Sequence, residues 1–327
     1  MSKKILLQTI IYLFFGLVVN AQGISSLEFK GNVVVPYNYE VNGSIVGGLS
    51  GISYNSSDST YCFVADKSPA RIFKADIKAN SKPDVQFIKV LELSPALLGQ
   101  SELEGIAYNY KSDQFYVSDE QKAGTRIIEL NNEAEFLRII EPINQSFLPL
   151  SGHNSGIEGL TISNDLQYLL YSFERPAEDC LDQALVKITK IRTEVSGNNQ
   201  TFLYRLHHVE NDKLNTNGIS EVLFISENKI LVMERAYIPG KGNVVRLYQA
   251  LLSSPNEDSE IVNCLDDSIT PLQSELLFDF GRVNGFAIDN AEGMTFNADR
   301  SILYIVTDNN FSKKQETQVV ALDVIWK

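Results

Sequence analysis

Carboxylates recur along the chain at two positions of a repeated pattern. Such groups exchange protons and bind hard cations. One position begins an apolar run, and the other ends the following β-rich run, 13 to 15 residues after the glycine (or Glu221) of the first run. The first position holds Glu104, Glu158, Glu221 and Glu292. The second position holds Asp66, Asp119, Glu174, Glu234 and Asp308.

The elements that position these acids are short strands. The five first runs begin at Ser50, Glu104, Glu158, Ser220 and Glu292, so they start 54, 54, 62 and 72 residues apart. Each is followed by a polar turn and a second run, which fits two strands joined by a tight turn. A third β-rich run follows in every copy and a fourth in four copies. The fifth copy has no fourth run before Lys327, whereas Ser26–Val35 is β-like and unassigned.

Quartets of antiparallel strands at this period predict an all-β fold, a β-propeller of four-stranded blades. We count five blades, or six if the longest interval hides a degenerate blade. The N-terminal strand would close the ring by completing the last sheet. An open β-sandwich is the alternative, but its strands would not recur as quartets.

In a propeller, strand one begins and strand two ends at the same face of the disc, so the acids should meet at the mouth of the central channel. Two carboxylates about 6 Å apart repel by roughly 3 kcal/mol at an effective dielectric constant near 20. A bound cation, arginine partners or a raised pKa would relieve this repulsion. Arginines follow the strand-two acids closely: Arg71, Arg126, Arg175 and Arg235.

Purely architectural Glu–Arg pairs between blades are one interpretation of this pattern. A hard-cation site, with Ca²⁺ as the most plausible ion, is another, because oxygen donors dominate and the chain has 3 histidines. Carboxylates that exchange protons without a metal are the third. For a metal we expect Glu104, Glu158, Glu221, Glu292 and Asp308 as ligands. For catalysis we expect Glu158, Glu234, Arg175 and Arg235.

The charge balance excludes some classes of partner. The chain has 28 Lys and Arg against 41 Asp and Glu, a formal net charge of −13. Nucleic-acid binding requires a basic surface, so we expect no nucleic-acid partner. The same charge disfavours adsorption to anionic membranes.

The N-terminus resembles an export signal. Lys3 and Lys4 precede an apolar run from Ile5 to Val19, and Val19 and Ala21 fit a cleavage site after Ala21. We therefore predict a signal peptide at 1–21, a single domain at 22–327, and a secreted or periplasmic protein with no membrane anchor in its mature form. A membrane anchor is the alternative, but the run is shorter than the roughly 20 residues that span a bilayer.

Other catalytic constellations give weak signals. The three cysteines suggest a buried thiol at Cys62 and leave a Cys180–Cys264 disulfide open. A Ser-His-acid triad would have to use His153 with a distant serine, and His207-His208 is interpreted as a connector to blade four. The sequence shows no zinc-protease motif, no thiol-phosphatase loop and no nucleotide-binding loop, and we expect no organic cofactor.

Several short segments carry a family resemblance over roughly residues 47 to 324. Among them are Gly48-Leu49-Ser50-Gly51-Ile52, Glu104-Gly105-Ile106-Ala107, Gly156-Ile157-Glu158-Gly159-Leu160, Leu231-Val232-Met233-Glu234-Arg235 and Val306-Thr307-Asp308-Asn309-Asn310-Phe311. In this order and spacing the chain resembles the phytase-like family labelled as having esterase-like activity of phytase. The resemblance implies a secreted β-propeller that hydrolyses a phosphoester or carboxylic ester. Ser50 departs from the acidic pattern.

Three functions follow from these observations. The first is a secreted hydrolase of a small anionic or ester substrate, in which Ca²⁺ at the mouth binds the anion and polarises a water. The second is a non-catalytic binding module with a protein partner, for which the acidic, Ser-rich segment Leu251–Gln273 would be a recognition loop. The third is a metal-dependent sugar-lactone hydrolase.

Overall fold

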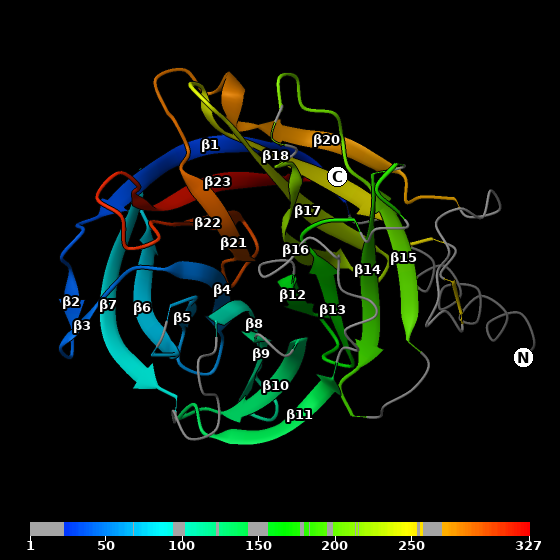
Figure 1. Ribbon diagram of the computed structural model, residues 1–327. Helices are drawn as coiled ribbons and strands as arrows, with labels where there is room; N and C mark the ends of the chain where they lie inside the picture. Colours follow the sequence, from blue (N-terminus) through cyan, green and yellow to red (C-terminus); the bar gives the residue numbers. More distant parts are fainter. Residues whose placement is uncertain are drawn as a thin grey trace, which may run out of the picture.

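Five four-stranded antiparallel sheets surround a central axis in the computed structural model of the chain (Figure 1). This arrangement confirms the predicted five-bladed β-propeller. The structure describes the chain except residues 1–22, 68, 94–101, 122–123, 143–155, 177–179, 183, 195–198, 213, 215, 254–255 and 258–269. The predicted signal peptide and His153 therefore lie outside the described residues. Within the described part, no helix is long and apolar enough to cross a membrane.

In blades 1 to 4 the strands lie in chain order from the channel outward. Blade 1 contains β4 (Leu49–Asn55), β5 (Thr60–Ala65), β6 (Arg71–Ala79) and β7 (Pro83–Glu92). Blade 2 contains β8 (Glu102–Asn109), β9 (Gln114–Gln121), β10 (Gly124–Asn131) and β11 (Phe136–Pro142). Blade 3 contains β12 (Ile157–Ile162), β13 (Tyr168–Phe173), β14 (Leu185–Arg192) and β15 (Gln200–Arg205). Blade 4 contains β16 (Gly218–Ser226), β17 (Lys229–Ile238), β18 (Gly242–Leu251) and β20 (Ser274–Asp279).

Blade 5 joins the two ends of the described chain. It contains β21 (Asn290–Phe296), β22 (Ile302–Asp308), β23 (Thr317–Trp326) and, as its outermost strand, β1 (Ile24–Val35). Leu27 of β1 pairs with Val324 of β23 in antiparallel register. This pairing confirms the predicted N-terminal closure, which covers an edge that would otherwise stay unpaired.

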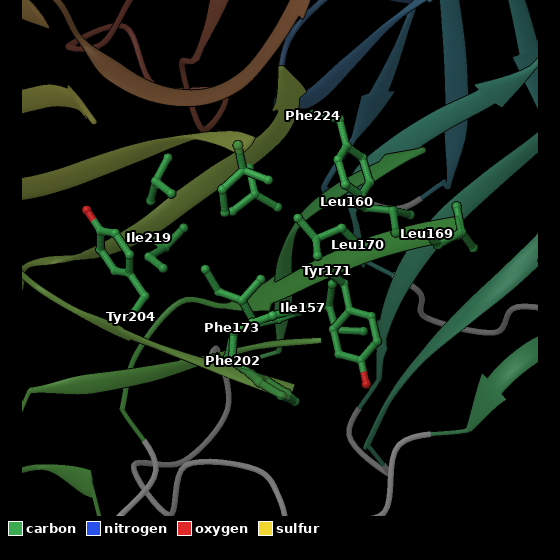
Figure 2. Close-up of a cluster of buried hydrophobic side chains, with 14 of the residues drawn as sticks. Ile157, Leu160, Leu169, Leu170, Tyr171, Phe173, Phe202, Tyr204, Ile219 and Phe224 are labelled. Atoms are coloured by element: carbon green, nitrogen blue, oxygen red, sulfur yellow. The ribbon is translucent and has the colours of Figure 1, made fainter. Parts of the chain in front are cut away.

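Apolar side chains fill the spaces between neighbouring blades, because each sheet must bury both faces. The middle strands are therefore nearly continuous runs of buried residues, as in Thr60–Ala65 of β5. Figure 2 shows part of a cluster that joins blades 2, 3 and 4 and contains Leu160, Tyr171 and Phe202 of blade 3 and Phe224 of blade 4. These clusters fix the angle between blades and hence the width of the channel.

Three short elements lie outside the main quartets. β2 (Glu40–Val41) and β3 (Ser44–Ile45) form a hairpin before blade 1, and η3 (Phe280–Arg282) follows β20. β19 (Asn256–Glu257) comes from the blade 4 insertion but pairs with β15 of blade 3. The segment Leu251–Gln273, the predicted recognition loop, therefore connects blades 3 and 4 through β19.

The structure tests part of what the sequence predicts for the cysteines. Cys62 is a free buried thiol, and burial raises its pKa to about 12, which confirms an inert side chain. Cys180 is buried and disulfide-bonded. Its expected partner Cys264 lies outside the described residues.

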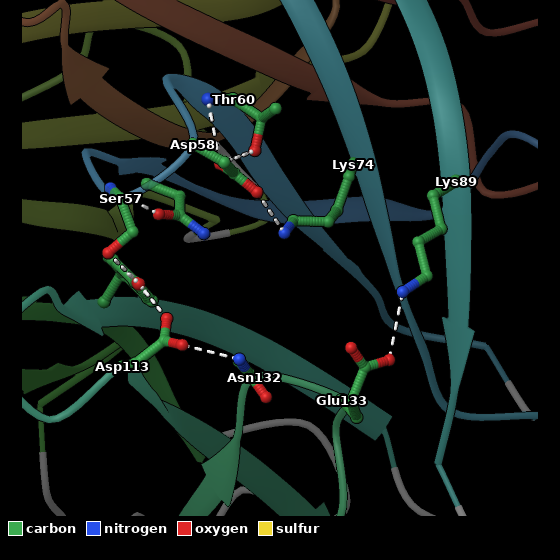
Figure 3. A network of polar contacts seen from close by, with 10 residues as sticks. Ser57, Asp58, Thr60, Lys74, Lys89, Asp113, Asn132 and Glu133 are labelled. Atoms are coloured by element: carbon green, nitrogen blue, oxygen red, sulfur yellow. Dashed lines mark hydrogen bonds and ion pairs between the residues drawn. The ribbon is translucent and has the colours of Figure 1, made fainter.

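The turns at the face opposite the channel mouth link blades 1 and 2 (Figure 3). Asp58 binds Lys74 at 2.6 Å within blade 1, and Lys89 of blade 1 reaches Glu133 of blade 2 at 3.0 Å. Both pairs are exposed on at least one side, so each contributes little, typically up to about 1 kcal/mol.

Candidate active site at the channel mouth

The inner strand of each blade is interrupted by a bulge near its start. The first unpaired residue of each bulge is Ser50, Glu104, Glu158, Ser220 or Glu292, and in blade 2 Gly105 is unpaired as well. A bulge turns a side chain out of the regular alternation. Three glutamates and two serines therefore form one ring at the channel mouth.

The second strands supply another ring at the same end. In each blade the residue just before the bulge pairs with a second-strand residue, and the next residue along that second strand is Asp66, Glu120, Glu174, Arg235 or Asp308, in blade order. Arg235 thus occupies in blade 4 the position at which the other four blades carry an acid. We call the residues of these two rings the channel mouth.

Arg235 offsets part of the negative charge. Its guanidinium lies 3.2 Å from Glu292 and 3.8 Å from Glu174, and it donates a hydrogen bond to Asn290 Oδ1. Asn290 Nδ2 in turn donates to Glu292 Oε1 at 2.7 Å. Although burial alone would lower it, the carboxylates of Glu292 and Glu174 raise the pKa of Arg235, so the arginine stays charged.

The remaining repulsion appears as raised carboxyl pKa values. Burial raises the pKa of Glu292 to about 8, although Arg235 opposes the rise. Burial and the neighbouring Asp66 raise the pKa of Asp308 to about 7. Both groups therefore exchange protons near neutral pH, as acid–base groups require.

Glu104 and Glu158 face the channel without a hydrogen-bond or ion-pair partner among the described residues. Each keeps part of its surface accessible. Burial, and then Asp66, raises the pKa of Glu104 well above its usual value. Burial, and then the charge of Glu104, raises the pKa of Glu158 well above its usual value. An accessible carboxyl with a raised pKa and no internal partner is available to a ligand.

The rim of the mouth carries two more cations. Lys67 Nζ lies 2.9 Å from Asp66 Oδ2, and Arg175 Nε lies 3.2 Å from Glu174 Oε2. Both side chains are partly exposed, Lys67 at 45% and Arg175 at 35%. They lie where an anionic substrate would enter.

Glu221 binds the backbone below the mouth and is not part of the ring of glutamates. The inner-strand bulge places Ser220 in the ring of glutamates and Glu221 one residue deeper, where the other blades have glycine (51, 105, 159 and 293). Glu221 Oε1 accepts hydrogen bonds from Leu160 N at 3.0 Å and Val222 N at 2.8 Å. Glu221 therefore binds backbone groups of neighbouring blades and does not project into the mouth.

The glycines leave the space that this carboxylate fills. A Cβ at Gly159 would lie 2.6 Å from Val222 N, and one at Gly105 would lie 2.6 Å from Leu160 Cβ. Inner strands this close have room for one side chain at this level. Burial raises the pKa of Glu221 well above its usual value, whereas the N–H groups of Val222, Leu160 and Met294 oppose that rise.

Two predicted acids lie away from the mouth. Asp119 and Glu234 are each one residue before the mouth position, opposite Leu103 and Ile219. Successive strand side chains point to opposite faces, so both point between blades. Asp119 pairs there with Arg126 at 2.7 Å, and Glu234 binds Tyr204 and His207. The expected catalytic role of Glu234 at the mouth is therefore corrected.

Sequence reasoning missed Glu120 and Asn290. Glu120 follows Asp119 directly, and only the strand register shows which of these two acids lies at the mouth. Asn290 precedes the repeat motif by two residues and carries no charge. Its contacts with Arg235 and Glu292 depend on the meeting of blades 4 and 5.

The donor set of the mouth fits a hard cation by its chemistry. Its acids supply oxygen donors, and Asp66 Oδ1 and Glu292 Oε2 are buried without a hydrogen-bond partner. Among the described residues, however, no three His, Cys, Asp or Glu side chains are grouped closely enough to hold an ion as they stand. A cation would have to draw these side chains together.

A separate cavity of about 750 Å³ lies at the opposite face, between blades 2 and 3. It is lined by Tyr116, Glu129, Arg138 and Arg192 among others. Arg138 pairs with Glu129, and Arg192 stacks over Tyr168, so these cations already have partners. The residues of the channel mouth do not line this cavity.

The family model described as "Phytase-like: Esterase-like activity of phytase" matches residues 44–311. The chain belongs to this family. The match spans all five inner strands and both rings of the mouth. No curated protein sequence matches the Phytase-like chain.

Solved structures share the architecture of the Phytase-like chain at low identity. An endo-arabinase from Bacteroides thetaiotaomicron matches with a TM-score of 0.50 and 11% identity, over 86% of this chain and 95% of that one. The catalytic domain of a GH62 α-L-arabinofuranosidase from Coprinopsis cinerea matches with a TM-score of 0.47 and 11% identity, over 92% and 98%. At this identity the likeness shows the fold alone.

Proposed function

We propose that the Phytase-like chain is an ester hydrolase whose reaction takes place at the channel mouth. The observation that carries the proposal is the pair Glu104 and Glu158 at the channel mouth, which also contains Arg235. Both glutamates are accessible, have raised pKa values and have no partner within the part of the chain that the structure describes.

The two glutamates suit proton transfer. A carboxyl whose pKa is raised toward neutrality donates a proton to a leaving oxygen, and an ionised neighbour takes a proton from water. After burial, the charge of Glu104 is the main cause of the raised pKa of Glu158, so an ionised Glu104 favours a protonated Glu158. The pair can therefore supply one base and one acid.

Arg235 suits the stabilisation of negative charge. It is held by Asn290, Glu292 and Glu174 and needs no rearrangement when charge develops on a substrate oxygen. Arg175 at the rim would orient an anionic group as it enters. These roles keep Glu158, Arg235 and Arg175 from the predicted catalytic set.

The charge of the mouth separates two substrate classes. A neutral carboxylic ester enters without an electrostatic penalty, whereas a phosphoester is repelled by ionised acids. Ca²⁺ held by Asp66, Glu104, Glu292 and Asp308 would supply positive charge for a phosphate and polarise a bound water. We propose that the protein takes carboxylic esters without metal and phosphoesters with Ca²⁺, and that the leader at 1–21 directs it out of the cytoplasm.

The test is a hydrolysis panel with purified full-length protein. The panel contains p-nitrophenyl acetate, p-nitrophenyl phosphate, phytate and a sugar lactone, each with EGTA or with 5 mM Ca²⁺. We expect Glu158→Gln and Glu104→Gln to lower kcat by about 10²- to 10⁴-fold, the usual contribution of one acid–base group. Glu133→Gln, at the opposite face, is the matched control and should keep full activity.

The proposal fails if no substrate turns over, or if Glu158→Gln and Glu104→Gln keep full activity. Lactone turnover alone would favour the sugar-lactone hydrolase. Inactivity on the whole panel would favour a binding module.

A further inference from the structure

A second group of chemically competent side chains lies between blades 3 and 4, outside the channel. It consists of Tyr204, His207, Glu234, Tyr248 and Ser274, which we call the His207 cluster. Tyr204 and His207 come from the end of blade 3. Figure 2 shows Tyr204 at the edge of the apolar cluster between the two blades.

The other three residues share one face of blade 4. Glu234 of β17 is opposite Arg246 of β18, and Tyr248 is two residues beyond Arg246 on β18. Ser274 is opposite Ala250, which is two residues beyond Tyr248. Because side chains alternate with a period of two, these three point toward blade 3.

Glu234 is a buried carboxylate with several donors. Its side chain is 2% exposed. It accepts hydrogen bonds from the Tyr204 hydroxyl at 2.7 Å, His207 N at 3.2 Å and Asn217 Nδ2 at 3.4 Å. These donors fix the position of the carboxylate.

His207 is oriented by two contacts. Its Nδ1 lies 2.8 Å from Glu234 Oε1, and its ring stacks on Tyr248 with centroids 3.8 Å apart and planes at 4°. When Nδ1 donates to the Glu234 carboxylate, Nε2 is left as an acceptor. Nε2 faces the Ser274 hydroxyl at 3.4 Å, a length common before substrate binds.

The reactive end of the cluster is accessible. The His207 side chain is 36% exposed and Ser274 is half-buried, whereas Tyr204 and Glu234 are buried. Leu276 follows Ser274 on the same face, opposite Tyr248, and is 41% exposed. An apolar acyl chain would find these two side chains beside the serine.

We propose that Ser274, His207 and Glu234 form a second hydrolytic site that cleaves neutral carboxylic esters through an acyl-enzyme. The order serine, histidine Nε2, histidine Nδ1, carboxylate is the one that activates a serine nucleophile in unrelated folds. Ser274 and His207 are the catalytic residues, and Glu234 is a positioning residue. This site is separate from the channel mouth and does not rest on the function proposed there.

The reaction balances with water as the second substrate. Ser274 Oγ attacks the ester carbonyl carbon while its proton passes to His207 Nε2. The alcohol then leaves with that proton, and the acyl group stays on Ser274. A water gives a proton to Nε2 as its oxygen attacks the acyl carbon, and Ser274 leaves by taking that proton back.

The test uses a fluorophosphonate, which forms a covalent adduct with activated serines. Full-length protein is incubated with the probe, and the modified residue is mapped by mass spectrometry. We expect labelling at Ser274 that is lost in Ser274→Ala and slowed at least about 100-fold in His207→Gln, since an unassisted serine is a weak nucleophile. Ser26→Ala, a partly buried serine on the outer strand of blade 5, is the matched control and should leave labelling unchanged.

Glu234→Gln separates positioning from a structural role. For hydrolysis of a short-chain p-nitrophenyl ester by protein that also carries Glu158→Gln, which removes turnover at the channel mouth, we expect Glu234→Gln to lower the remaining kcat at least about 10-fold with KM nearly unchanged, at an unaltered melting temperature. The proposal is overturned if wild-type protein gives no Ser274 adduct, or if His207→Gln is labelled as fast as wild type. Glu158→Gln should keep full labelling, so failure here and failure of the channel mouth are distinguished.

Discussion

Glu234 and Arg235 are consecutive residues on β17, yet their side chains enter different sites. Arg235 extends into the channel mouth and binds Glu292 of blade 5 at 3.2 Å. Glu234 extends between blades 3 and 4, where the Tyr204 hydroxyl donates to it at 2.7 Å. The alternation of a β-strand thus divides two adjacent charges between two candidate sites.

Loss of Arg235 should destabilise the protein. Arg235→Gln leaves Glu292 and Glu174 close together without their cation, and removing one partner of a buried pair typically costs about 3–5 kcal/mol. We expect a lower free energy of unfolding at pH 8, measured by urea denaturation. The loss should be smaller at pH 5, where Glu292 is protonated. Arg235→Lys, which keeps the charge, is the control, and an equal loss at both pH values would contradict the explanation.

Stability should fall as the pH rises from about 4.5 to 8. The pKa of Glu292 is about 8 when folded against 4.5 ordinarily, so the folded state holds a proton that the unfolded state has released. Its contribution is full below pH 4.5 and is lost by about 1.4 kcal/mol per pH unit as the pH rises, until Glu292 ionises near pH 8.

Asp308 should act in the same direction up to about pH 7, its own raised pKa. Melting temperatures between pH 5 and 9 check both contributions, and Glu292→Gln should flatten the decline. Stability that rises across this range in wild type and in Glu292→Gln alike would contradict the assignment.

Removal of the Glu221 side chain should lower the stability of the protein. Glu221→Gly copies the residue of the other four blades, but it leaves the N–H groups of Leu160 and Val222 without their acceptor. We expect a loss of about 2–4 kcal/mol by chemical denaturation, since each buried unsatisfied group costs about 1–3 kcal/mol. Glu221→Gln keeps a carbonyl acceptor and should lose less; equal losses would argue against this role.

Calcium should raise the melting temperature if the mouth binds it. A dissociation constant of 0.1 mM would give about 2.7 kcal/mol at 10 mM Ca²⁺, which corresponds to a shift of several degrees. Glu104→Gln should reduce the shift, whereas Glu133→Gln should not. An unchanged midpoint at 10 mM Ca²⁺ in wild type would exclude a stabilising ion at this site.

The architecture could be predicted because the pattern of strands and turns repeats along the chain. Five copies of two strands and a turn recur in the chain, and the unassigned segment Ser26–Val35 matches a missing fourth strand. The paired strands β1 and β23 show that this inference was sound. Burial on both faces of each sheet imposes the pattern on every copy.

The composition of the site was only partly predictable. Gathering of Glu104, Glu158, Glu292 and Asp308 at one end follows from the repeat, and the structure brings them together. Glu221, Asp119 and Glu234 were assigned to the same end because they are acidic. A shift of one residue along a strand reverses the direction of a side chain, and a charge count does not detect that shift.

The sequence by itself determined the repeated four-stranded blade, the closure of the ring and the crowding of acids at one face, because these depend on spacing along the chain, whereas the structure decided between five and six blades. Tertiary structure alone decided which acid meets which partner. Arg235 offsets the charge of Glu292 because blades 4 and 5 are neighbours around the axis. His207 faces Ser274, 67 residues away, because blade 3 packs on blade 4. Contacts between blades depend on distances in space, which spacing along the chain does not contain.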